Sequence, residues 1–203
     1  SRKLITPNKK KQKTKILAVV GSVNANTTAQ MEELWLSQRT HNEFVHTREL
    51  LEGEKRRELE IRRVVNSILG ECDRNNISTV TGDGIYPENR IDFTPYMERY
   101  QCSLDEVTEM INSGFAEITY RIFKAEDTFK GLYTSGGDIT VAVCKKFDTA
   151  GLSLLDEVLP LAAYGQFLKG EFGGVHIITK GGSQGNKDAI NKCITYLKEK
   201  LYI

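Results

Sequence analysis

Glycine, serine and aspartate lie together at residues 135–138, where a short apolar stretch gives way to a helical pattern. Residues 132–134 have the character of a strand, and residues 139–147 have helical spacing. A strand, a glycine turn and a helix start together present free backbone N–H groups and the positive end of a helix to a phosphate. The sequence therefore predicts a phosphate-binding turn formed by Ser135, Gly136 and Gly137.

Asp138 follows this turn, where we expect the N-cap of the helix. Its carboxylate could accept hydrogen bonds from the first free amides of the helix. It could instead bind a Mg²⁺ ion that bridges phosphate oxygens. Both interpretations stay open at this stage, and the second makes Asp138 a metal ligand and a candidate catalytic residue.

Two further strand ends carry small residues. Gly21 and Ser22 follow the apolar run at residues 15–20, and Lys180, Gly181 and Gly182 lead into a glycine-rich segment that ends at residue 185. The carboxyl ends of parallel strands share one edge of a sheet, where ligands bind, and glycine lets the backbone approach a ligand closely. One such turn is often only turn geometry, but three favour a ligand that carries phosphate. Lys180 could contact that phosphate or could be a solvated lysine at a strand end.

Several classes of protein are excluded or disfavoured. The sequence has no GxxxxGK[ST] motif, no GxGxxG after its first strand and no GxSxG elbow. The net charge of +1 gives no sign of a nucleic-acid partner, and no apolar run reaches the roughly 18 residues of a membrane span. Four scattered cysteines without a CxxC pair indicate reduced thiols and a cytoplasmic protein.

Strands and helices alternate along the whole chain. This order predicts an α/β fold, with a mostly parallel sheet and helices on both faces, as in a Rossmann-like three-layer sandwich. Residues 1–14 are expected to be a linker or the edge of the chain, and residues 15–203 one nucleotide-binding domain. Segment 85–103 is expected to be a long excursion, and segment 152–164 to contain no helix because of Pro160. The predicted strands are 15–20, 43–47, 77–81, 132–134 and 173–180; the predicted helices are 29–39, capped by Asn26, Thr27 or Thr28, then 54–72, 103–123 with a capping box from Ser103 to Glu106, 139–147 and 187–201.

Three of these segments resemble, in order and spacing, a known family. They are residues 19–22 (VVGS), 135–138 (SGGD) and 179–185 (TKGGSQG), and the family is the C-terminal nucleotide-binding domain of the four-carbon acid sugar kinases, which act on threonate, erythronate and 3-oxo-tetronate. The resemblance spans about residues 15–201. In this family the GS serine, the GGDT turn and a glycine of the KSGxFG loop contact ATP. Carried over one by one, these contacts imply an ATP site made of Ser22, Gly136, Gly137, Asp138 and Gly182.

The sequence departs from the family pattern at three positions. Ile139 replaces the threonine that follows the aspartate, and Gly181 and Gln184 replace a serine and a phenylalanine. Family members also carry an N-terminal domain for the sugar acid, with an acidic DD motif, and this sequence contains nothing like it. The resemblance therefore implies the ATP-binding half of such an enzyme.

The resulting hypothesis is a kinase that uses ATP and Mg²⁺ to phosphorylate a hydroxyl of a small four-carbon sugar acid, which binds through the N-terminal domain. A homo-oligomer stays open. The alternative is a non-catalytic module that binds a nucleotide or sugar phosphate, which Ile139 and Gly181 would favour. An NAD-dependent enzyme of Rossmann type is disfavoured by the missing fingerprint.

Overall fold

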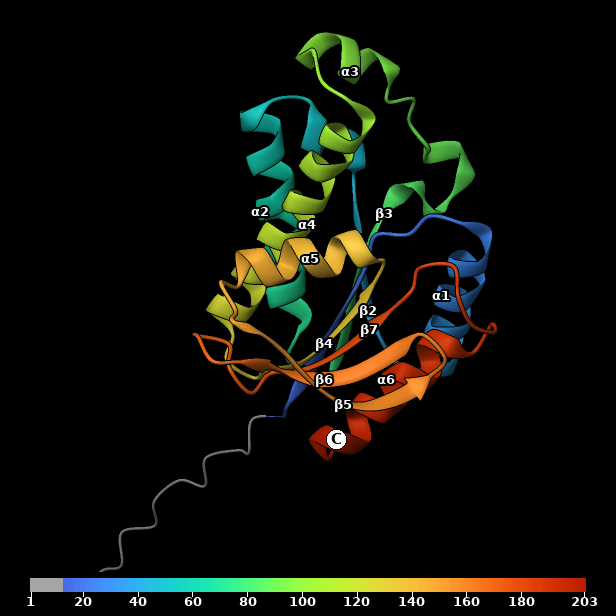
Figure 1. The fold of residues 1–203 in the computed structure, drawn as a ribbon, viewed down its shortest axis with the longest axis vertical. Helices are drawn as coiled ribbons and strands as arrows, with labels where there is room; N and C mark the ends of the chain where they lie inside the picture. The colour runs from blue at the N-terminus through green and yellow to red at the C-terminus, as the bar shows by residue number, and fades with distance from the viewer. Residues whose placement is uncertain (1–12) are drawn as a thin grey trace, which may run out of the picture.

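A single mixed sheet forms the centre of the molecule (Figure 1). The structure is a computed structural model, and it describes residues 13–203, so residues 1–12 of the predicted linker lie outside it. Seven strands pair in the order β2-β3-β1-β4-β7-β6-β5. The pairs from β2 to β7 are parallel, and the pairs β7–β6 and β6–β5 are antiparallel.

Helices separate the strands from β1 to β5, as the sequence predicts, but β5, β6 and β7 follow one another with no helix between them, so the predicted alternation does not extend along the whole chain. The elements are β1 (Lys15–Val20), α1 (Ala25–Ser37), β2 (His41–Val45), η1 (Thr47–Leu51), α2 (Glu54–Glu71), β3 (Ile77–Gly82), η2 (Asp83–Ile85), η3 (Pro87–Asn89), α3 (Thr94–Tyr100), α4 (Leu104–Ala125), β4 (Phe129–Ser135), α5 (Gly137–Lys146), β5 (Gly151–Leu159), β6 (Ala162–Leu168), β7 (His176–Lys180) and α6 (Ala189–Leu201).

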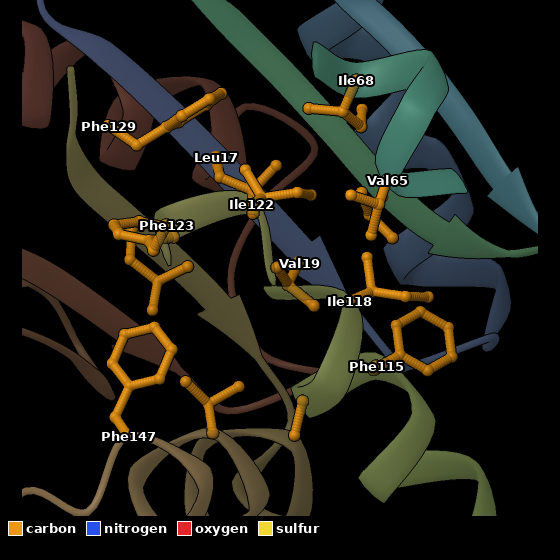
Figure 2. Close-up of a cluster of buried hydrophobic side chains, with 14 of the residues drawn as sticks. Leu17, Val19, Val65, Ile68, Phe115, Ile118, Ile122, Phe123, Phe129 and Phe147 are labelled. Atoms are coloured by element: carbon orange, nitrogen blue, oxygen red, sulfur yellow. The ribbon is translucent and has the colours of Figure 1, made fainter. Parts of the chain in front are cut away.

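The side chains of β1 alternate between two hydrophobic cores, as the two-residue period of a strand requires. Leu17 and Val19 pack with residues of α2, α4 and α5 (Figure 2). Ile16 and Ala18 pack on the opposite face with residues of α1 and α6. The predicted three-layer α/β sandwich is therefore confirmed, with α2, α4 and α5 on one face of the sheet and α1 and α6 on the other (Figure 1).

Segment 152–164, for which no regular structure was predicted, forms most of the antiparallel hairpin β5–β6. Pro160 stops a helix as expected, but it lies in the turn between two strands. Leu154 and Leu155 are consecutive and both exposed on this edge strand, which disrupts the alternation that marks a half-buried strand. The hairpin covers one side of β7 and leaves the carboxyl ends of β1, β4 and β7 as neighbours.

Helix α1 begins four residues before its predicted start. Its N-cap is Asn24, whose side chain accepts from the backbone N–H of Thr27 at 2.9 Å, so the prediction of a cap at residues 26–28 was wrong. The capping box of α4 is confirmed, because Ser103 and Glu106 each accept from the other's backbone N–H. The excursion at 85–103 contains two 3₁₀ turns and the short helix α3.

Two expectations from composition are also addressed by the structure. All four cysteines are free thiols, with Cys72 and Cys193 buried and Cys102 and Cys144 half-buried. No helix within residues 13–203 combines the length and the apolar character that a bilayer crossing requires.

Candidate functional site

The three strand ends that the sequence singled out meet at one edge of the sheet. Val20, Ser135 and Lys180 are aligned across β1, β4 and β7, so the three following loops leave the sheet side by side. A Cβ placed on Gly182 would lie 3.1 Å from Cβ of Ser22 and 3.8 Å from Cα of Gly136. The structure therefore brings together the predicted residues Ser22, Gly136 and Gly182 from three distant parts of the chain.

The edge where β1 and β4 lie side by side is the switch point of the sheet. The loop after β1 leads into α1 on one face, and the loop after β4 leads into α5 on the other face. Connections that diverge in this way open a crevice at the carboxyl ends of the strands, where ligands bind in open α/β sheets. Ser22 and Gly136 lie on the two sides of this crevice.

Lys180 has a different place from the one that its position at a strand end suggested. Its side chain is only 2% exposed, so it is not a solvated lysine. Its Nζ donates to the carbonyl of Gly181 at 2.7 Å and to that of Gln184 at 2.6 Å, and lies 3.5 Å from that of Gly182. Burial lowers the pKa of this lysine. The ammonium group therefore fixes the glycine loop through its carbonyl oxygens.

The first turns of α1 hold the same loop from the side. Three polar residues of this helix, Asn26, Thr27 and Gln30, donate side-chain hydrogen bonds to its carbonyls. Thr27 Oγ1 donates to Gly182 at 2.8 Å, Asn26 Nδ2 to Ser183 at 2.8 Å and to Gly185 at 3.1 Å, and Gln30 Nε2 to Gln184 at 3.0 Å and to Gly185 at 3.1 Å. Every carbonyl from residue 181 to residue 185 therefore accepts from Lys180 or from α1.

This arrangement fixes the direction of the loop's amides. In a planar trans peptide the N–H points opposite to the C=O, so carbonyls held by Lys180 and α1 turn the N–H groups away from them. The N–H of Gln184 donates to Gly181 O at 3.2 Å. Within residues 13–203, the N–H groups of Gly182, Ser183 and Gly185 have no acceptor. A loop with satisfied carbonyls and unsatisfied amides is suited to bind an anion.

Ser22 is oriented by residues that sequence reasoning missed. The side-chain amide of Asn24 donates to Ser22 Oγ at 2.7 Å, while its carbonyl oxygen caps α1. The hydroxyl of Thr27 lies 3.1 Å from Ser22 Oγ as well as 2.8 Å from Gly182 O. The many polar residues between positions 22 and 30 could have indicated a hydrogen-bond network. Only the fold shows that this network reaches the loop after β7.

The turn after β4 leads directly into the bare N-terminus of α5. Gly136 has φ +104°, a conformation that favours glycine, and its N–H donates to Lys180 O at 3.0 Å. Gly136 is the N-cap of α5 and provides no side-chain cap. The expectation that Asp138 is the N-cap was therefore wrong, because the helix begins at Gly137, one residue before it.

Asp138 is exposed in the first turn of α5. No cluster of three histidine, cysteine, aspartate or glutamate side chains that could hold a metal occurs among residues 13–203. Asp138 would thus be one protein ligand, and Mg²⁺ commonly uses one or two carboxylates with water and substrate phosphates. Its chemistry fits this role beside a bound phosphate.

The presence of Ile139 in place of the family's threonine has a structural explanation. Ile139 is 2% exposed, and a Cβ on Gly21 would lie 2.3 Å from its Cγ1, so Gly21 provides the space in which Ile139 packs. The hydroxyl of Thr140 lies 2.9 Å from that of Thr134 and 3.2 Å from Gly136 O. The Thr140 side chain therefore stabilises the glycine turn by linking it to Thr134 in β4.

Backbone hydrogen bonds pair Ser135 and Gly181, both predicted site residues, with neighbouring segments. The Ser135 side chain is fully buried beside Tyr133, while its carbonyl accepts from Gly21 N–H at 3.3 Å. The N–H of Gly181 donates to Leu161 O at 3.1 Å, in the turn of the β5–β6 hairpin. Both residues connect neighbouring strand ends.

Comparison with known proteins identifies the family of this chain. Residues 17–190 match the family model described as a nucleotide-binding C-terminal domain. The chain is 37% identical over 191 residues to D-erythronate kinase of Heliobacterium modesticaldum, covering 92% of this chain and 42% of that protein. It is 23% identical over 189 residues to D-threonate kinase of Salmonella typhimurium, covering 93% and 44%. The chain thus spans less than half the length of these relatives.

Solved structures show the same fold. A Bordetella bronchiseptica protein, described as a domain of unknown function with bound citrate and as a domain-swapped dimer, superposes with a TM-score of 0.70 at 20% identity, over 92% of this chain and 41% of that one. A Haemophilus influenzae protein superposes with a TM-score of 0.66 at 14% identity, over 91% and 40%.

Proposed function

This chain belongs to the nucleotide-binding C-terminal domain family of the four-carbon acid sugar kinases, and we propose that it is the ATP-binding half of such a kinase. The complete enzyme would transfer the γ-phosphoryl group of ATP to a hydroxyl of a small sugar acid. The relatives named as erythronate and threonate kinases support a four-carbon acceptor.

One observation carries the proposal: the loop at residues 181–185 has every carbonyl satisfied by Lys180 or α1 and directs three unsatisfied amides away from them. Gly182 of this loop lies beside Ser22 and beside Gly136, the N-cap of α5. A helix N-terminus and converging amides together suit the charge of a polyphosphate. No lysine side chain needs to reach the phosphates in this arrangement.

Phosphoryl transfer depends mainly on positioning and on stabilising charge. The amides of Gly137 and of the 181–185 loop would hold the phosphate oxygens, and the hydroxyl of Ser22 would contact them from the loop after β1. Asp138 would hold Mg²⁺, which neutralises charge on the phosphates when bound. The acceptor sugar acid and its general base are assigned to another domain, in line with the share of the relatives that this chain covers.

The remaining features of the proposal concern the setting of the enzyme. Four free cysteines suit a reducing compartment such as the cytoplasm. A structural neighbour described as a domain-swapped dimer supports a homo-oligomer. The buried Ile139, which offers no hydroxyl where the family has threonine, favours the second candidate, a non-catalytic nucleotide-binding module.

Calorimetric titration of the chain with ATP and Mg²⁺, and separately with NAD, tests the binding step. We expect saturable ATP binding and no NAD binding; the reverse result would contradict the proposal. To separate kinase from binding module, the chain is exchanged for the C-terminal part of the Heliobacterium enzyme that it matches. A chimera that binds ATP and phosphorylates erythronate supports the kinase, whereas one that binds ATP without turnover supports the module.

A further inference from the structure

A cleft of about 630 Å³ lies between the first half of α4 and one side of α5. Asp138 of α5 lines its wall, directly after the glycine turn. The cleft continues along α5 to Lys145, a distance of about 10 Å at 1.5 Å of rise per residue. It therefore begins at Asp138, beside the turn that we assign to phosphate, and extends from there by roughly the length of a nucleoside.

Three other clefts in the described part of the chain fit a nucleoside less well. The cleft beside residues 184–192 has a volume of only about 210 Å³, below the 300–1,000 Å³ that is usual for ligand pockets. The cleft at Asn75 and Asn76 lies where β3 begins, at the opposite edge of the sheet. The cleft between α2 and α4 is lined by paired charges such as Glu58 with Arg121.

Small and apolar side chains are part of the lining of the α4–α5 cleft. Ala116 and Ala142 line it together with Val141, which is 53% exposed although it is a large apolar residue. Small and apolar residues on facing helices leave a slot in which a flat ring could bury its faces. An exposed valine at this position is explained if a ligand covers it.

The rim of the cleft carries polar groups without partners. Within residues 13–203, the side chains of Asp105, Glu109 and Asn112 make no hydrogen bond or ion pair with other side chains or the backbone. A carboxamide donates and accepts at once, so it can pair with the N6 amino group and N7 of adenine. Carboxylates can accept from the hydroxyls of a ribose.

From this geometry we propose that the α4–α5 cleft holds the adenosine of the bound nucleotide. Ala116, Val141 and Ala142 contact the base, Asn112 reads its N6/N7 edge, and Asp105 or Glu109 accepts from the ribose. The inference rests on the proposed function, because it assumes that the phosphates lie at the glycine loops. It adds a prediction that the phosphate site alone does not make, namely a preference for ATP over GTP.

Three probes separate the two halves of the nucleotide site: ATP, GTP and inorganic tripolyphosphate, each titrated calorimetrically with Mg²⁺. The variant Asn112→Leu removes the polar edge at nearly constant size, and Ala142→Phe fills the slot. Leu154→Phe, on the exposed face of β5, is the matched control for an added aromatic ring. Thermal melts establish that each variant is folded.

We expect Asn112→Leu to weaken ATP binding about tenfold, as a lost bidentate contact does, and to abolish the preference over GTP. Ala142→Phe should weaken ATP about a hundredfold, while tripolyphosphate binds both variants within twofold of the unchanged chain. If both variants bind ATP as the unchanged chain does, the adenosine lies elsewhere and this inference is overturned, although the phosphate site stands. If the unchanged chain binds neither ATP nor tripolyphosphate, the proposed function fails as well.

Discussion

Replacing Lys180 with methionine tests whether this lysine organises the glycine loop or serves as a counter-charge to phosphate. The substitution keeps an unbranched apolar stem of similar length but removes the ammonium group. Two short hydrogen bonds are lost, at 2.7 Å to Gly181 O and 2.6 Å to Gln184 O. Each carbonyl keeps one partner, the N–H of Gln184 and the side chain of Gln30 respectively.

The size of the effect follows from these contacts. A hydrogen bond to a charged group contributes about 1.5–3 kcal/mol, so two of them contribute about 3–6 kcal/mol. Burial of the ammonium, which lowers the pKa of Lys180, offsets part of this contribution. We therefore expect the lower end, about 3 kcal/mol, which corresponds to a Tm lower by roughly 6–12 °C for a domain of this size.

The assay is a thermal melt of the ligand-free chain, followed by titration with ATP and Mg²⁺. Lys187→Met is the matched control, because Lys187 is exposed and its ion pair with Glu33, at 3.4 Å, lies at the surface. We expect the control to change stability by less than about 0.5 kcal/mol. In Lys180→Met, ATP binding should weaken about tenfold, because the amides lose their fixed direction.

A counter-charge would behave differently. If Lys180→Met binds ATP weakly but melts at the temperature of the unchanged chain, the lysine acts on the ligand rather than on the loop. That result would refute the role derived from its hydrogen bonds. Unchanged melting together with unchanged binding would remove both roles.

Three further predictions concern the same region and its surroundings. Asp138→Asn should weaken ATP binding about tenfold with Mg²⁺ present but not in EDTA, because a lost metal ligand matters only when the metal is bound. If calorimetry gives the variant and the unchanged chain the same affinity for ATP with Mg²⁺ as well as in EDTA, Asp138 has no metal role. Gly136→Ala should lower the free energy of unfolding by about 1–3 kcal/mol in a urea melt, because alanine is strained at φ +104°. Gly137 is the first residue of α5 and a Cβ there would meet no atom within 4 Å, so Gly137→Ala should change stability by less than about 0.5 kcal/mol. Similar losses in both variants would contradict the backbone argument. Burial raises the pKa of Cys193 to about 12, whereas the thiol of the unfolded chain ionises near pH 8.5. Ionisation at pH 10 therefore stabilises the unfolded state by about 2 kcal/mol, and in urea melts the free energy of unfolding of Cys193→Ala should fall by that much less between pH 7 and pH 10 than that of the unchanged chain. If the two proteins lose the same stability over this range, the thiol is not the cause.

The sequence was sufficient to locate the three loops but not to predict the role of each residue in them. Gly136 and Gly182 stand out because glycine occurs at three strand ends, those of β1, β4 and β7, although turn geometry alone could explain any one of them. The role of Lys180 was not visible, because its partners are backbone carbonyls, which carry no sequence signal. Asn24 was missed for a related reason, since a cap is recognised only once the first helical residue is known.

The hairpin β5–β6 was missed because its outer strand lies at the edge of the sheet. Leu154 and Leu155 both face solvent, so the pattern has neither the alternation of a half-buried strand nor the apolar run of a buried one. The parallel strands were predictable, since β1 and β3 are buried on both faces and read as continuous runs. Strand order could not be predicted, because it depends on contacts between residues far apart in the chain.

The most direct test of the account is a crystal structure of the chain with Mg²⁺ and a non-hydrolysable ATP analogue. We predict phosphate oxygens within hydrogen-bonding distance of Ser22 Oγ and of the backbone N–H groups of Gly137, Gly182 and Ser183, with the Lys180 ammonium still bound to the loop carbonyls. A triphosphate bound at another edge of the sheet, with these amides facing only solvent, would contradict the central claim.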